Sequence, residues 1–167
     1  MVTIDRLREL LSYDPETGIF QWRVTRGSRA PAGKIAGTVR KKDGYRQINV
    51  DGHIYLAHRL AWFYVYESWP DGDIDHENTN KIDNRISNLR EATESQNGAN
   101  RTKSKKLGRV YTSKYKGVHW NKVVRKWHTS VMVQRKKIDL GYFETEESAY
   151  QAYCAASKCH FGEFARH

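Results

Sequence analysis

A basic, polar stretch without hydrophobic periodicity divides this chain and limits it to small folded units. The stretch is TKSKKLGRVYTSK at residues 102–114, a composition typical of a linker that stays mobile until it meets a partner. Only 38% of the 167 residues are apolar, so two modest cores are expected in place of one large core. The sequence therefore predicts a domain at 1–101, a linker at 102–114 and a second domain at 115–167.

The positive charge is concentrated on the C-terminal side of the chain. Residues 1–100 contain 14 basic and 14 acidic residues, whereas residues 101–167 contain 15 and 5. This asymmetry suggests a polyanion-binding part joined to a neutral part. Because Trp and Tyr interleave with the basic residues, nucleic acid is favoured over the alternative, a charged tail that only keeps the chain soluble.

Other compositional features narrow the class of protein. No apolar run is long enough to cross a membrane, and the N-terminus lacks the apolar stretch of a signal peptide, so a cytoplasmic protein without a membrane partner is expected. The two cysteines, Cys154 and Cys159, form no CxxC pair, and a disulfide framework or a structural zinc site is not expected.

Local patterns predict a mixed α+β first domain. A helical spacing of apolar residues covers 3–14, and the following PETG is a turn. Two alternating runs joined by Asp51-Gly52 predict a β-hairpin over 45–56. Residues 57–69 are typical of a buried helix, although their aromatic residues also suit a strand.

The Asn-rich stretch DIDHENTNKIDNRISNLREATESQN at residues 73–97 combines the residue types that metal-dependent phosphodiester cleavage needs. It is predicted as strand, loop, strand and helix, and Thr93 with Gln96 forms a capping box at the helix start. Asp75 offers a hard oxygen to Mg²⁺ or Mn²⁺, and His76 offers a general base. By residue types alone, an ordinary surface pair remains the alternative for these two residues.

The spacing Asp75-His76, Asn84-Arg85-x-x-Asn88-Leu89-Arg90 and Asn97 resembles the HNH endonucleases, also called ββα-metal or His-Me finger nucleases. It is most similar to the phage and intron-encoded homing branch, and the likeness covers roughly residues 40–101. The resemblance implies that Asp75 and Asn97 bind the metal, that His76 is the general base and that Asn88 orients it.

Further residues of the same segment receive open assignments. His58 matches a histidine often present in this branch and is a catalytic candidate, with a buried structural role as the alternative. Asn84 is expected to cap or shape the loop. Arg85 and Arg90 either contact phosphate or pair with nearby acidic residues.

The C-terminal part predicts three short strands followed by one helix. The strands fall in YKGVHW, KWHTSVMVQ and KKIDLGYF, and the helix in ETEESAYQAYCAASKCHFG begins after a cap candidate, Thr145. Lys116-Gly117-Val118, Lys126-Trp127 and the segment Leu140–Phe143 resemble the Apetala/ethylene-response-factor DNA-binding domain. That family lays a three-stranded antiparallel sheet in the major groove of DNA.

Period-two alternation assigns the two faces of the central strand. Trp127, Thr129, Val131 and Val133 should meet the helix, and the alternate residues should face DNA. The candidate contacts to double-stranded DNA, with a core position as an equal alternative for Trp120, are Lys116, His119, Trp120, Arg125, Lys126, His128, Arg135 and Lys137.

These features together predict a metal-dependent, homing-type HNH endonuclease that nicks DNA and leaves a 5′-phosphate and a 3′-hydroxyl. A C-terminal DNA-binding domain targets it, no obligate protein partner is evident, and a DNA-associated place in a bacterial host cell is expected. The main alternative is a non-catalytic DNA-binding transcriptional regulator. An RNA-binding protein is a further reading that rests only on charge and aromatic content.

Overall fold

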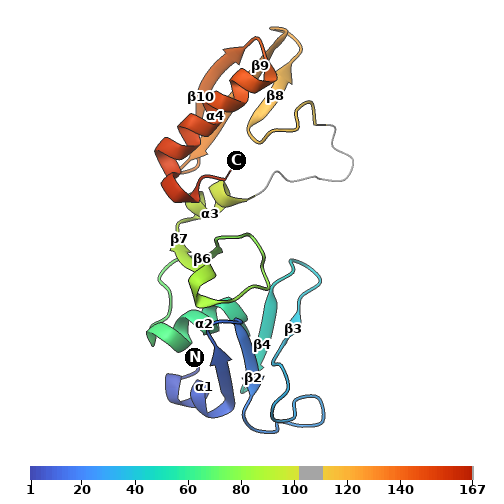
Figure 1. Cartoon of the computed structure of the whole chain (residues 1–167), viewed down its shortest axis with the longest axis vertical. Helices are drawn as coiled ribbons and strands as arrows, with labels where there is room; N and C mark the ends of the chain where they lie inside the picture. The colour runs from blue at the N-terminus through green and yellow to red at the C-terminus, as the bar shows by residue number, and fades with distance from the viewer. Residues whose placement is uncertain (102–110, 167) are drawn as a thin grey trace. The chain divides into compact units, whose positions relative to one another are not determined.

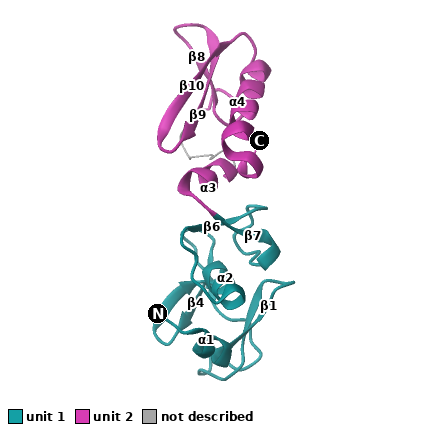
Figure 2. Cartoon of the chain, turned by 90° about the vertical axis from the view of Figure 1, so that its left-hand side faces the viewer, with its two compact units in different colours: residues 1–91 teal, residues 92–167 magenta. Residues whose placement is uncertain are grey.

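The structure is a computed structural model that describes residues 1–101 and 111–166 (Figure 1). Of the predicted linker at 102–114, residues 102–110 lie outside the described residues. Residues 111–114 are described, and the Ser113 hydroxyl and the Lys114 amide both donate to the Glu146 carboxylate, so this end of the predicted linker packs on the second unit. The chain divides into two compact units, residues 1–91 and residues 92–167 (Figure 2). The assignment of residues 1–101 to a nuclease domain and of residues 115–167 to a DNA-binding domain stays a prediction.

The first unit combines two α-helices with three small sheets, which agrees with the predicted α+β class. The sheets have the strand orders β1-β2, β3-β4-β5 and β6-β7. In chain order the elements are α1 (Ile4–Leu10), β1 (Leu11–Asp14), β2 (Ile19–Trp22), β3 (Thr38–Val39), β4 (Arg46–Val50), β5 (His53–Leu56), α2 (Ala57–Tyr66), β6 (Asp73–His76), the 3₁₀ turn η1 (Ile86–Asn88) and β7 (Leu89–Ala92).

The N-terminal helix is shorter than its apolar spacing predicts. Thr3 caps α1 by accepting a hydrogen bond from the Arg6 amide, and the helix ends at Leu10. Residues 11–14, which were expected to continue the helix, form β1 and pair antiparallel with β2, with Tyr13 opposite Phe20. Leu11 is fully buried as a strand residue, so its apolar side chain contributes to the core although the helix has ended.

The hairpin and the helix that follow it agree with the sequence. Strands β4 and β5 pair antiparallel with Val50 opposite His53, and both turn residues, Asp51 and Gly52, have positive φ. Arg6 and Arg26 each form an ion pair with Asp51. The aromatic run after the hairpin is helical as α2, and not a strand.

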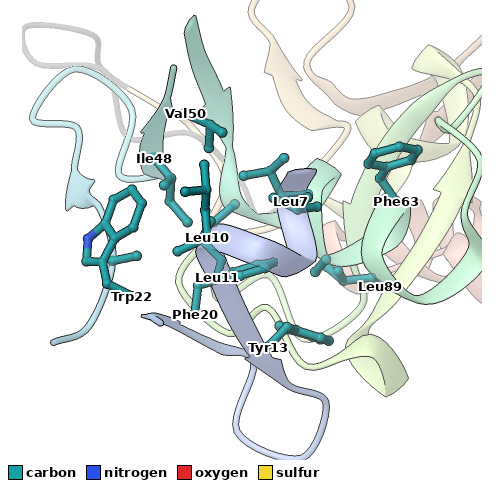
Figure 3. Packing of buried hydrophobic residues seen from close by; sticks show 14 of the residues in the cluster. Leu7, Leu10, Leu11, Tyr13, Phe20, Trp22, Ile48, Val50, Phe63 and Leu89 are labelled. Atoms are coloured by element: carbon teal, nitrogen blue, oxygen red, sulfur yellow. The ribbon is translucent and has the colours of Figure 1, made fainter. Parts of the chain in front are cut away.

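The core of the first unit gathers apolar side chains from all three sheets and both helices (Figure 3). Leu7, Phe20, Ile48 and Leu60 are completely buried. Leu89, at the start of β7, joins the same cluster. The strand that follows the 3₁₀ turn is therefore tied to the main core of the unit.

The second unit contains the three-stranded antiparallel sheet and the helix that the sequence predicts. The sheet has the order β10-β9-β8, with a bulge between Asp139 and Gly141. Its elements are α3 (Glu94–Asn100), β8 (Val118–Asn121), β9 (Lys126–Val133), β10 (Lys136–Phe143), α4 (Glu146–Phe161) and the 3₁₀ turn η2 (Gly162–Phe164).

Helix α4 packs on the face of β9 that alternation assigned to it. Thr129 and Val131 are buried, and Val131 belongs to one cluster with Tyr153 and Phe161. Thr145 caps the helix as predicted. Trp120 pairs with Trp127 in the sheet register and therefore lies on the helix side of the sheet, which favours a packing role for it over a base contact.

Gly117, just before β8, packs closely against Tyr153 of α4. Its φ is +74°, and a Cβ built there would lie 2.3 Å from Cδ2 of Tyr153. A side chain at this position would overlap the ring, so the close contact requires glycine. No helix in the described part of the chain is long and apolar enough to cross a membrane.

Candidate active site

The predicted catalytic pair lies at the end of β6 and is buried. Asp75 is 5% exposed and His76 is 4% exposed, so neither behaves as an ordinary surface residue. Strand alternation predicts opposite faces for the two side chains, and both faces of β6 are covered at this point. Buried polar groups require partners, and the partners define the site.

Asn84 is the residue that bonds to the His76 ring. The Nε2 atom of His76 lies 3.0 Å from Oδ1 of Asn84. An amide oxygen only accepts hydrogen bonds, so Nε2 is the donor and carries the proton. In this tautomer Nδ1 is the unprotonated nitrogen, which is the form that can act as a base.

The predicted contact of Asn88 with the His76 ring is wrong, because Asn84 bonds to the ring and Asn88 bonds to the loop backbone. Asn88 is the last residue of the 3₁₀ turn η1, before β7 begins. Its Oδ1 accepts from the Asn78 amide and its Nδ2 donates to the Asp83 carbonyl. Asn88 therefore stabilises the loop between β6 and β7. Asn84, which was expected only to cap or shape this loop, also binds the ring of His76. Two asparagines four residues apart cannot be ranked by sequence alone.

Burial controls the protonation of the histidines. Burial lowers the pKa of His76, and the hydrogen bond that its Nε2 donates to Asn84 opposes this shift. Burial also lowers the pKa of His58 to about 3. Both rings are therefore neutral near pH 7.

His58 lies beside His76 at the start of α2. The two rings meet edge to face with centroids 5.1 Å apart, and Tyr45 packs against both. His58 is 5% exposed, and its Nδ1 has no hydrogen-bond partner among the described residues. This environment favours the buried structural role for His58, and its catalytic role stays a prediction.

Asp75 and Arg90 form a buried ion pair. Nη2 of Arg90 lies 3.1 Å from Oδ2 of Asp75, and both side chains are largely buried. Arg85 likewise binds Asp83 through two nitrogens. Both arginines therefore pair with neighbouring acidic residues, which is one of the two roles expected for them. Their contact with phosphate stays a prediction.

The donor chemistry at Asp75 fits a hard divalent cation. Carboxylate oxygens are the ligand type that Mg²⁺ and Mn²⁺ bind, usually with several waters and substrate phosphates completing the shell. No cluster of three or more His, Cys, Asp or Glu side chains suited to a metal occurs within residues 1–101 and 111–166. Asn97, the second predicted ligand, is half-buried on α3 in the second unit, and its pairing with Asp75 stays a prediction.

Helix α3 begins as the sequence predicts. The Thr93 hydroxyl accepts from the Gln96 amide, and the Gln96 side chain accepts from the Thr93 amide. The order β6, β7, α3 follows the strand–strand–helix order of the resemblance. The ββα-metal arrangement itself remains a prediction.

The sheet face opposite α4 holds part of the predicted DNA-binding set. His119 and Lys137 are exposed there, and Arg125 is exposed in the turn between β8 and β9. Lys126 forms an ion pair with Glu144, and Arg135 forms one with Glu94. These pairs are largely exposed and leave both cations accessible to a polyanion.

One member of the predicted DNA-binding set, His128, is buried, and a second, Lys116, is half-buried. The His128 side chain is 5% exposed and its Nε2 lies 3.0 Å from both carboxylate oxygens of Asp139. Nζ of Lys116 donates to the carbonyls of Gly98, Ala99 and Arg101 at the end of α3. Burial lowers the pKa of Lys116 to about 8. Lys116 thus caps α3, and its predicted contact with DNA stays a prediction.

A comparison with family models bears on the class of the first site. Residues 55–99 match the model for HNH endonuclease, a segment that contains Asp75, His76, Asn84, Asn88 and Asn97. The match supports an HNH nuclease domain in this chain and suggests a nuclease that acts on DNA. No curated protein and no solved structure matches the chain significantly.

Proposed function

We propose that this protein is a metal-dependent DNA endonuclease of the homing type, targeted by its C-terminal sheet. One observation carries the proposal. Within the segment that matches HNH endonuclease, His76 is buried beside a carboxylate, and the amide of Asn84 holds its ring with Nε2 protonated. A neutral, oriented imidazole is what general-base catalysis near pH 7 requires.

The reaction follows from this chemistry. Nδ1 of His76 takes a proton from a water molecule as the water oxygen attacks the phosphorus. The bond between phosphorus and the 3′-oxygen breaks, leaving a 5′-phosphate and a 3′-hydroxyl. A Mg²⁺ or Mn²⁺ ion, when held by Asp75, would neutralise charge on the phosphate and on the leaving oxygen.

The second unit supplies affinity for double-stranded DNA. Support comes from its three-stranded antiparallel sheet and single long helix, the elements expected from the resemblance to the Apetala/ethylene-response-factor domain, and from the basic side chains on the exposed face and its turns. Such side chains mostly contact phosphates, so they position the duplex more than they read bases. With one histidine site per chain, a monomer is expected to nick one strand.

The test uses supercoiled plasmid with the full-length protein, Mg²⁺ or EDTA, and two variants. His76→Ala removes the general base and should lower the nicking rate by about 10²- to 10⁴-fold. His53→Ala, at an exposed position on β5, is the matched control and should cut like the wild type. If the wild type binds the plasmid and no divalent ion supports cutting, the proposal fails and a non-catalytic DNA-binding regulator takes its place.

A further inference from the structure

The loop that holds His76 is itself held by the N-terminal hairpin. Tyr13 lies on β1, and its hydroxyl donates a 2.7 Å hydrogen bond to the main-chain carbonyl of Asn84. Tyr13 is 8% exposed and Asn84 is 1% exposed. This buried hydrogen bond joins segments 71 residues apart in the chain and fixes the position of the loop backbone relative to β1.

The turn of the same hairpin contacts the loop at a second point. Gly18 has φ +70°, and a Cβ built there would lie 2.3 Å from the Arg85 nitrogen and 2.4 Å from the Asn84 carbonyl carbon. The turn is rigid, since Asp14 accepts hydrogen bonds from the Glu16 amide and the Thr17 hydroxyl. The turn backbone therefore packs directly on the backbone of the loop.

These two contacts lead to the catalytic ring in a short sequence of steps. Tyr13 and Gly18 fix the backbone at Asn84, and the Asn84 side chain accepts the hydrogen bond from Nε2 of His76. A side chain that is completely enclosed has little freedom to correct a displaced backbone. A shift of the loop would therefore be transmitted to the orientation of the ring.

We infer that the β1–β2 hairpin orients the general base, with Tyr13 and Gly18 as positioning residues that act through Asn84. The inference rests on the proposed function for its effect on cleavage. It goes beyond the HNH match, which begins at residue 55, because it assigns part of the active-site geometry to residues 13–18. Neither residue contacts DNA or the reacting atoms in this role.

The test compares two hydroxyl deletions within one aromatic cluster of the full-length chain. Tyr13→Phe removes the bond to Asn84 and keeps the ring in the core. Tyr64→Phe is the control, because Tyr64 packs against Tyr13 and Phe20 and makes no hydrogen bond to Asn84 among the described residues. Two readouts are needed: kcat and KM for plasmid nicking, and the ¹⁵N chemical shifts of the His76 ring, which report the tautomer.

Tyr13→Phe should lower kcat by about 10-fold, because the His76 ring is misplaced. KM should be nearly unchanged, because the affinity for DNA is not affected. Its His76 signals should move from the Nε2-protonated tautomer toward a mixture, while Tyr64→Phe keeps wild-type values in both readouts. Gly18→Ala should act in the same direction as Tyr13→Phe. Its control is Gly33→Ala, which also has positive φ but no atom within 4 Å of the added carbon.

Equal kcat and equal tautomer populations in Tyr13→Phe and Tyr64→Phe would overturn the inference. The ¹⁵N readout does not depend on cleavage, so failure of the hairpin to orient His76 is distinguishable from failure of the nuclease assignment. A wild type that never cuts removes the proposed function. A tautomer shift confined to Tyr13→Phe and Gly18→Ala would still support the orienting role of the hairpin.

Discussion

The candidate catalytic residues of the first unit and the exposed cations of the second unit differ in burial. In the first unit, Asp75, His76, Asn84 and Asn88 are all buried, and each has a polar contact within the unit. In the second unit, the cations on the sheet, such as Lys137, are exposed. A buried polar group has to be matched by a specific neighbour, whereas an exposed cation needs only water and a polyanion.

This difference explains why substitutions should act differently in the two units. Removing a member of the buried network leaves a partner unsatisfied, so the effect is large and specific to geometry. Removing an exposed cation weakens a long-range attraction that many residues share. The four predictions that follow set the two behaviours against each other, beginning with the largest expected effect.

Asn84→Ala tests the buried network directly. The change deprives Nε2 of His76 of its acceptor, and kcat for DNA nicking should fall by about 10- to 100-fold, as is typical when the group that orients a catalytic ligand is lost. Asn88→Ala is the comparison, since its side chain bonds only loop backbone. A larger loss of kcat in Asn88→Ala than in Asn84→Ala would contradict the assignment of Asn84.

Acid should destabilise the first unit over the pH range in which His58 binds a proton in the unfolded chain but not in the folded chain. The folded pKa of His58 is about 3, below its ordinary value near 6.5, so between these values the unfolded chain binds a proton that the folded chain does not. The free energy of unfolding should therefore fall as the pH falls from 6.5 toward 3, by on the order of 4 kcal/mol in full. Hydrogen exchange of the two units, followed from pH 7 to pH 4, measures it.

The matched variant for that experiment is His58→Leu, which cannot bind a proton at this position. It should reduce the pH dependence of the first unit and leave the part that His76 contributes. Carboxylates titrate in a separate window: the Arg85 ion pair, for instance, lowers the pKa of Asp83 to about 2, so its contribution is lost only below pH 4. An unchanged pH dependence in His58→Leu would contradict the role of His58.

Gly117→Ala probes packing in the second unit. The added carbon would overlap the Tyr153 ring at 2.3 Å and would sit at a positive φ, so the unit should lose about 2–3 kcal/mol of stability. Gly141→Ala shares the positive φ but has no atom within 4 Å, and it should cost clearly less. Chemical denaturation of both variants separates steric overlap from backbone strain, and equal losses would contradict the packing argument.

Lys137→Met should give the smallest effect. Loss of one exposed phosphate-binding cation should weaken duplex affinity by about 3- to 10-fold and reduce the salt dependence of log K by about 1. At saturating DNA, kcat should not change. Lys158→Met, an equal change of charge on α4, is the control, and equal weakening in both variants would show that only net charge matters.

Patterns along the chain predicted most of the elements. The capping box at Thr93, the Asp51-Gly52 turn and the three strands followed by α4 all depend on interactions within a few residues, which a sequence displays directly. The extension of α1 through residues 11–14 was wrong, because these residues pair with β2 and long-range pairing overrides helical spacing.

Residue types and spacing also predicted which side chains carry the chemistry of the candidate site. Asp75 and His76 were identified as a pair from the sequence, and the segment around them matches HNH endonuclease. Only the tertiary structure decided their partners. The choice between Asn84 and Asn88, the inward turn of Lys116 and the burial of His128 depend on which backbone segment lies opposite each side chain. That is settled by packing between residues far apart in the chain, which no local pattern records.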